Sequence, residues 1–220
     1  MTPMTRICTQ FFAAFAALFL ASCANQKPTT EIAKEGQPEA KPKFVNPHPA
    51  GTYDHFKAEP NYPKTSSVWK NEELLSQTNP SNSHIVVSLE KQRAFLMNNE
   101  EVAMDYPICS GTKSRPTPKG TFHVLEKIVD KSSNRYGKIL DASGNVVNSD
   151  ADSTQDNIPA GGKFKGAPMR YWMRLTNDGV GHHIGPVKRY PASHACIRGP
   201  SAVMPLVYSK MKVGSQIKVE

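Results

Sequence analysis

The chain has 220 residues, the length of one ordinary domain with accessory segments. It is 38% hydrophobic with 18 Pro and 14 Gly, and no internal stretch reaches the roughly 18 consecutive apolar residues that would make a helical membrane span. The formal charge is +8, and the excess lies in residues 84–220, which carry nineteen Lys or Arg against twelve Asp or Glu. A basic surface suits an anionic polymer or surface, and a solvated basic face is the alternative. No nucleic-acid motif accompanies the charge, so we expect no nucleic-acid partner.

Residues 1–22 indicate an export signal. Arg6 precedes the apolar run 11–21, which is too short for a permanent span. The tetrad LASC, ending at Cys23, resembles the lipobox of bacterial lipoproteins, in which cleavage precedes a cysteine that receives lipid on its sulfur. We therefore expect lipidation of Cys23, and the alternative is an ordinary secretory signal with an incidental cysteine. Ala24 replaces the Asp that commonly retains such lipoproteins at the inner membrane, which favours an outer-membrane anchor facing the periplasm.

Residues 23–65 are rich in Pro and charge and predict an extended, lipid-anchored tether. Residues 66–83 predict a short helix and a lead-in, with Ser66 or Ser67 as the helix cap.

The ordered domain is predicted over residues 84–220, where period-two alternation indicates a β-meander in 84–107. Further strands are expected at 121–128, 169–176 and 213–219, and a short helix at 200–211 with Pro205 near its middle. The turn-rich segment 129–164 is predicted to be a long loop, either a wall or lid of a cleft or a surface decoration.

The motif YPASHACIRGP at 190–200 carries the chemistry. In an extended segment His194 and Cys196 project to one face, which places an imidazole beside a thiol. A free thiol is mostly protonated at neutral pH, so a nucleophilic Cys196 needs a base. An exported free thiol is easier to explain as a working group than as a buried structural one, although a disulfide with Cys109 is an alternative.

These motifs resemble the L,D-transpeptidase family of bacterial cell-wall enzymes, whose pattern is HxG followed by SHGC and an apolar residue. The chain has HIG at 183–185, SHACIR at 193–198, SGT at 110–112 and TPKGTF at 117–122, so the resemblance covers about 84–220. It implies a mainly β fold, a β-sandwich of two sheets with one or two short helices. It also implies a cysteine nucleophile that attacks the third residue of a peptidoglycan tetrapeptide stem, releases the terminal D-alanine and passes the acyl group to an amine.

The resemblance also assigns roles. His183 is the general base, and we expect the backbone carbonyl of Ile184 or Gly185 to hold its other ring nitrogen. His194 orders the cysteine loop, with base function as the lesser alternative, and the N–H groups of Ala195 and Cys196 form the oxyanion hole. The substrate-binding candidates are Tyr171, Gly185, Ser193 and Arg198.

The chain departs from the family pattern at Ala195, where the family has glycine. A positive φ there would cost an alanine roughly 1 kcal/mol or more. We therefore keep two alternatives beside the transpeptidase, namely an L,D-carboxypeptidase in which water resolves the thioester, and a non-catalytic wall-binding lipoprotein. A zinc site built from His182, His183, His194 and Cys196 is disfavoured, because adjacent histidines of a strand point to opposite faces. We expect no metal or cofactor and a monomeric protein.

Overall fold

The computed structural model describes residues 43–220. The predicted signal peptide, the lipidation site Cys23 and the first part of the tether lie outside these residues. Residues 44–220 belong to one unit. None of the helices in 43–220 has the length and apolar character needed to cross a membrane.

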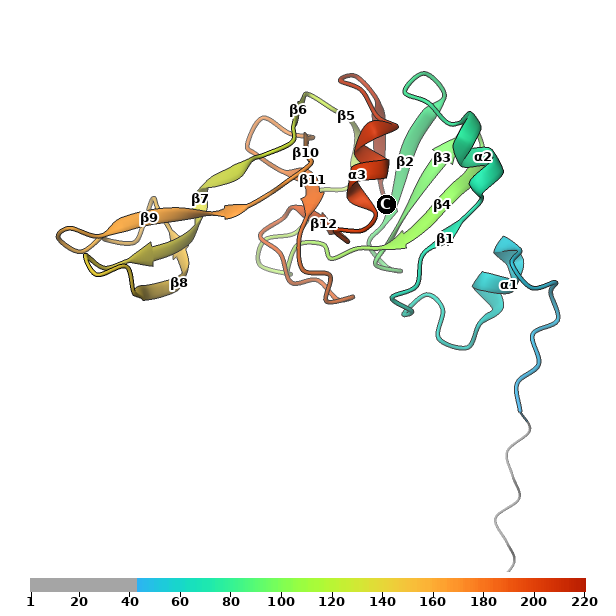
Figure 1. The fold of residues 1–220 in the computed structure, drawn as a ribbon, viewed down its shortest axis with the longest axis horizontal. Helices are drawn as coiled ribbons and strands as arrows, with labels where there is room; N and C mark the ends of the chain where they lie inside the picture. Colours follow the sequence, from blue (N-terminus) through green and yellow to red (C-terminus); the bar gives the residue numbers. More distant parts are fainter. Residues whose placement is uncertain (1–42) are drawn as a thin grey trace, which may run out of the picture. The chain divides into compact units, whose positions relative to one another are not determined.

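The predicted meander is confirmed by β2 (Ser83–Ser88), β3 (Arg93–Asn98) and β4 (Glu101–Pro107). Ile85 lies opposite Leu96, and Leu96 lies opposite Met104; all three are fully buried, so the apolar alternation sets the register. With β1 (Trp69–Lys70), β13 (Gln216–Val219) and β5 (Gly120–His123), these strands form a six-stranded sheet in the order β1, β4, β3, β2, β13, β5 (Figure 1).

A second sheet has the strand order β12 (Ile197–Gly199), β11 (Gly181–Ile184), β10 (Trp172–Arg174) and β6 (Glu126–Ile128). The single strand expected at 121–128 is in fact two strands, β5 and β6, which belong to different sheets. The strand expected at 169–176 is also shorter than predicted. Tyr171 has φ 55°, outside the extended region, so regular pairing begins only at Trp172.

Segment 129–164 is not a loop. It belongs to a third, antiparallel sheet of β7 (Ser132–Leu140), β8 (Val146–Asp152) and β9 (Lys163–Pro168), which projects from the other two sheets and is called the arm below (Figure 1). The turn-forming residues close its hairpins. Asp141 Oδ1 accepts hydrogen bonds from the N–H groups of Ser143 and Asn145, and Gly144 has φ 86°.

Residues 43–220 form three short helices, α1 (Tyr53–Ala58), α2 (Glu72–Gln77) and α3 (Met204–Ser209). The helix expected in 66–83 is α2, but its cap is Asn71, whose side chain accepts from the N–H of Leu74 at 3.0 Å. Pro205 lies in the first turn of α3, where its missing N–H costs nothing, so it does not kink the helix as expected.

The core lies where the six-stranded sheet, the four-stranded sheet and α3 meet. Ile217 of β13, Met173 of β10, Ile197 of β12 and Val207 of α3 belong to one buried apolar cluster. The predicted mainly β class is confirmed, with the arm as a sheet beyond the two that were expected.

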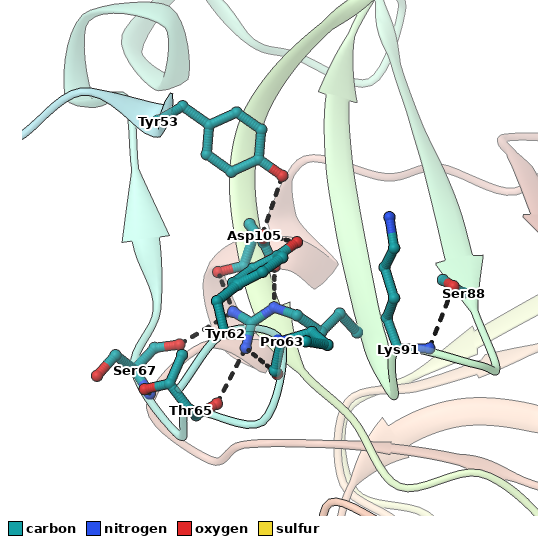
Figure 2. A network of polar contacts seen from close by, with 9 residues as sticks. Tyr53, Tyr62, Pro63, Thr65, Ser67, Ser88, Lys91 and Asp105 are labelled. Atoms are coloured by element: carbon teal, nitrogen blue, oxygen red, sulfur yellow. Dashed lines mark hydrogen bonds and ion pairs between the residues drawn. The ribbon is translucent and has the colours of Figure 1, made fainter. Parts of the chain in front are cut away.

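A buried ion pair attaches the N-terminal segment to this core. Arg93 of β3 and Asp105 of β4 are both fully buried and bond to each other. The hydroxyls of Tyr53 and Tyr62 point to Asp105 and donate to its Oδ2 at 2.9 and 3.2 Å (Figure 2). Arg93 in turn donates to the backbone carbonyl of Thr65 at 3.0 Å.

This network extends the folded unit toward the N-terminus. The predicted tether reaches to residue 65 and the predicted catalytic domain starts at His84, yet residues 53–67 carry α1 and supply partners to the buried pair. The physical reason is that a buried charge requires hydrogen-bond partners, and the meander by itself leaves Arg93 and Asp105 without enough of them. Residues 53–65 therefore belong to the folded unit rather than to the extended tether that their proline content predicted.

Candidate active site

The register of the second sheet brings His183 and Cys196 to one face. Strand β12 runs parallel to β11, with His183 opposite Arg198. Cys196 directly precedes β12 and lies two residues before Arg198, so its side chain is expected on the face that carries Arg198 and His183. Trp172 of β10 shares this face, and its ring covers Gly181, where an added Cβ would lie only 2.4 Å from the indole.

His183 is held as a neutral imidazole with a defined tautomer. Its side chain is buried, and Nδ1 lies 2.7 Å from the carbonyl oxygen of Ile184, one of the two expected acceptors. Because that carbonyl can only accept, Nδ1 carries the hydrogen and Nε2 keeps its lone pair. Burial lowers the pKa of His183 to about 4, so the ring is neutral at neutral pH. The ring therefore keeps at neutral pH the free lone pair that a proton acceptor needs.

His182 points to the opposite face of β11 and is structural. It is fully buried, with Nδ1 at 2.9 Å from the carbonyl of Ile197 and Nε2 at 3.0 Å from the hydroxyl of Tyr106. Burial also lowers the pKa of His182 to about 4. Residues 43–220 contain no group of three His, Cys, Asp or Glu side chains placed to hold a metal ion.

Cys196 carries a free thiol at a cavity of about 520 Å³. Burial raises the pKa of this thiol, although the N–H of Gly181 and the charge of Arg198 act in the opposite direction. The thiol is therefore protonated at neutral pH and depends on a base to become a nucleophile. Cys109, the other cysteine within 43–220, is also free and fully buried, and its Sγ lies 3.3 Å from the carbonyl of Tyr190.

The loop 190–196, called the cysteine loop, is fixed by a second loop at 109–119. Thr112 N–H donates to the carbonyl of Ser193 at 3.0 Å, and Ser193 N–H donates to the carbonyl of Ser110 at 3.0 Å. Thr117 Oγ1 donates to the carbonyl of Ala195 at 2.7 Å. The SGT and TPKGTF motifs thus position the nucleophile through its backbone.

Ala195 has φ 74°, in the left-handed region that favours glycine. The conformation that raised doubt about alanine at this position is therefore present. The hydrogen bond that its carbonyl accepts from Thr117, a residue of the 109–119 loop, holds Ala195 in this conformation.

His194 points toward the arm. The left-handed Ala195 interrupts the extended backbone, so the alternation expected to place His194 and Cys196 side by side does not apply. The ring of His194 lies 4.4 Å from that of Tyr136 in β7, and its Nε2 lies 3.9 Å from Asp150 Oδ1 in β8. Burial and nearby Arg115 lower the pKa of His194.

The remaining predicted site residues lie outside the cavity wall. The ring of Tyr171 packs 5.4 Å from that of Tyr208 of α3, against the core. Arg198 covers Gly185 and donates to the carbonyl of Ala192 at 3.5 Å, and Ser193 is buried with its hydroxyl donating to the carbonyl of Cys196. The structure therefore brings Cys196, Ala195 and His194 to the cavity, and leaves Tyr171, Gly185, Ser193 and Arg198 as supports of the surrounding backbone.

The cavity also has walls that sequence reasoning missed. Residues 133–136 of the arm, Arg115 of the 109–119 loop, and Trp172 and Arg174 of β10 all line it. Trp172 Nε1 and Arg174 Nε both donate to Glu126 Oε1, at 3.0 and 3.2 Å. The turn-rich composition of 129–164 had raised the possibility of a cleft wall, but no spacing in the sequence indicates which of its residues face Cys196.

The family model of the L,D-transpeptidase catalytic domain matches residues 82–219, more than half of the chain. The chain belongs to this family. The matched range contains all three sheets of this L,D-transpeptidase domain except β1, and the segment with α1, β1 and α2 lies outside it, with β1 paired to β4 of the meander.

Solved structures of L,D-transpeptidases are similar to the chain at low identity. That from Mycobacterium smegmatis is 20% identical, with a TM-score of 0.48, over 63% of this chain and 58% of that one. A cysteine-to-serine variant from Enterococcus faecium is 24% identical, with a TM-score of 0.46, over 64% and 50%. L,D-transpeptidase 1 from Mycobacterium tuberculosis is 23% identical, with a TM-score of 0.44, over 62% and 60%. The chain thus spans less than two thirds of each of these proteins. Curated proteins gave no match.

Proposed function

We propose that the protein is a peptidoglycan L,D-transpeptidase that acts through a thioester on Cys196. The observation that carries this proposal is the pairing of His183 of β11 with Arg198 of β12, which puts the buried, neutral imidazole on the face expected for the thiol of Cys196, and this thiol lines a cavity. The family supplies the substrate class, a peptidoglycan stem peptide.

In the acylation step, His183 Nε2 takes the proton of the Cys196 thiol as Sγ attacks the carbonyl of the third stem residue. The oxyanion that forms is stabilised by the N–H groups of Ala195 and Cys196, where one donor is commonly worth about 3 kcal/mol. The C–N bond to the terminal D-alanine then breaks, and His183 returns the proton to the leaving amine. The hydrogen bond to Ile184 keeps the base in the tautomer that this step needs.

In the second step, an amine of a neighbouring stem attacks the thioester and gives its proton to His183. The C–S bond breaks, the thiol takes the proton back, and a cross-link between third-position residues forms. Water in place of the amine gives carboxypeptidase activity from the same thioester. His194 orders the cysteine loop through Tyr136, and Arg198 does so through Ala192, so neither needs to transfer a proton.

The test is to incubate the detergent-solubilised chain with disaccharide-tetrapeptide and to follow D-alanine release and the mass of the protein. We expect release of D-alanine and a thioester adduct on Cys196, with cross-linked dimers or free tripeptide showing whether an amine or water resolves it. Cys196→Ala should abolish both signals, whereas Cys109→Ala, the matched control thiol, should keep them. If the wild type neither releases D-alanine nor forms an adduct with stem or carbapenem, the chain is a non-catalytic wall-binding protein.

We also propose that Cys23 carries the lipid that holds the protein at a membrane facing the periplasm, with the outer membrane favoured by Ala24. Metabolic labelling with a fatty acid should mark the wild type and the Cys8→Ala control, but not Cys23→Ala. A label that survives Cys23→Ala would contradict the proposal.

A further inference from the structure

The cavity beside Cys196 is strongly basic. Four cationic side chains line it, from three different parts of the fold: Arg115 of the 109–119 loop, Lys131 and Arg135 of the arm, and Arg174 of β10. Among the residues of 43–220 that line it, Asp178 is the only carboxylate. A cavity of one sign attracts a ligand of the other.

Two of these cations already have carboxylate partners. Arg135 Nη2 lies 2.9 Å from Asp152 Oδ2, and Arg174 Nε lies 3.2 Å from Glu126 Oε1. Their charges are balanced within the fold and serve to hold the arm and β10 in place.

Arg115 and Lys131 differ from this pair. Within residues 43–220, neither forms an ion pair with an Asp or Glu side chain. The Cζ atom of Arg115 lies over the ring of Tyr136, 5.3 Å from its centroid, and this cation–π contact leaves guanidinium N–H groups for an acceptor. The Lys131 backbone carbonyl accepts from Met169 N–H at 2.8 Å, which fixes the base of the arm from which its side chain reaches the cavity.

Both residues line the same cavity as Cys196. Arg115 belongs to the loop whose Thr117 holds the carbonyl of Ala195, next to Cys196. The peptide residue attacked by Cys196 must reach this cavity, where Arg115 and Lys131 are the lining cations without a carboxylate partner among residues 43–220. Guanidinium and ammonium groups recognise carboxylates through charge-assisted hydrogen bonds.

We propose that Arg115 and Lys131 determine donor specificity by binding a free carboxylate on the residue whose carbonyl reacts with Cys196. The inference rests on the proposed function, which supplies the peptide donor. It adds that a donor in which this carboxylate is amidated is a poor substrate, because a carboxamide offers no charge to the two cations.

The test uses two disaccharide-tetrapeptides that differ at one group, a side-chain carboxylate on the third residue or the carboxamide in its place. Acylation of Cys196 in the full chain is followed by mass spectrometry without an acceptor, so that only the donor is compared. We expect kcat/KM for the acid to exceed that for the amide by about five- to tenfold, the size of one or two partly exposed charge-assisted contacts.

Arg115→Gln and Lys131→Gln should each bring this ratio toward one by slowing the acid donor more than the amide donor. Arg115→Lys keeps the positive charge and should keep most of the preference for the acid donor. It therefore distinguishes an effect of the lost charge from an effect of a disturbed fold. Lys113→Gln and Lys138→Gln are matched controls, because these exposed lysines belong to the same loop and to the arm but do not line the cavity. Both should keep the wild-type ratio.

Equal rates for the two donors in the wild type, or a ratio unchanged in both glutamine variants, would overturn the inference while leaving the proposed function in place. A preference for the acid that appears only when an acceptor is added would also overturn the inference, since the two cations would then bind the acceptor rather than the donor. Failure of both donors to acylate Cys196 would instead contradict the proposed function.

Discussion

Thr117 Oγ1 donates to the carbonyl of Ala195 at 2.7 Å and accepts from the N–H of Gly111 at 2.8 Å. One hydroxyl therefore joins two loops that are almost eighty residues apart in the chain. Gly111 leaves the room for this junction, because a Cβ there would lie 2.2 Å from the carbonyl oxygen of Arg115. The position of the nucleophile is set from outside its own segment.

Thr117→Val should therefore misplace Cys196 while keeping the shape of the side chain. Thr117 is buried, so its loss leaves a carbonyl and an N–H without partners, at a cost of about 1–3 kcal/mol each. We expect a lower free energy of unfolding in urea and slower thioester formation with a carbapenem. Thr117→Ser, which keeps the hydroxyl, is the control and should retain most of the stability and most of the acylation rate. An equal loss in the two variants would contradict the role of the Thr117 hydroxyl in joining the two loops.

Ala195→Gly should stabilise the protein. The φ of 74° costs an alanine roughly 1–2 kcal/mol, and the greater unfolded-state freedom of glycine offsets part of this, which leaves a gain of about 0.5–1 kcal/mol. Urea denaturation measures this gain, and turnover should be preserved or raised. Ala192→Gly, in the same loop, is the control and should gain nothing. A large loss of turnover in Ala195→Gly would show that the methyl group has a role of its own.

The acid limb of the pH–rate profile should lie near pH 4. Burial lowers the pKa of His183 to about 4, so the base is neutral above this pH and becomes protonated below it. The second-order rate of carbapenem acylation, measured from pH 3.5 to 8, should therefore fall by half near pH 4. A half-loss near the ordinary histidine pKa of about 6.5 would contradict the role of burial.

The same burial makes the free energy of unfolding depend on pH, so the acylation assay needs a check that the protein is folded at each pH. His182 and His183 have folded pKa values of about 4, below the unfolded value of about 6.5. The unfolded state therefore binds more protons between these values, and the stability present above pH 6.5 is lost as the pH falls toward 4. Circular dichroism at each pH should confirm that the acylation rates come from folded protein.

Removing one partner of the Arg93–Asp105 pair should unfold the N-terminal segment and destabilise the domain. Arg93→Met leaves a buried carboxylate with only tyrosine hydroxyls, which we expect to cost about 3–5 kcal/mol in urea denaturation. The Arg93→Met, Asp105→Leu double variant removes both charges and should recover much of that loss. Proteolysis at residues 53–67 should rise in the single variant, and an unchanged cleavage rate would show that the pair does not hold this segment.

Local patterns in the sequence were sufficient for the meander and for the family. Alternation in 84–107 predicted three strands, since one face had to be buried, and the HIG and SHAC motifs predicted the L,D-transpeptidase family. Turn residues were harder to interpret. Those at 141–145 close a hairpin of the arm rather than form a loop, because Asp, Gly and Asn suit both structures.

By itself, the sequence determined the mainly β fold, the family and the residue types at Cys196, His183 and Ala195, because these depend on local periodicity and on short motifs. Only the tertiary structure decided which way the side chains face. The register of β11 with β12 places His183 opposite Arg198, a single left-handed residue turns His194 toward the arm, and long-range packing brings Arg115 and Lys131 to the cavity. Such contacts join residues far apart in the chain, so no local pattern records them.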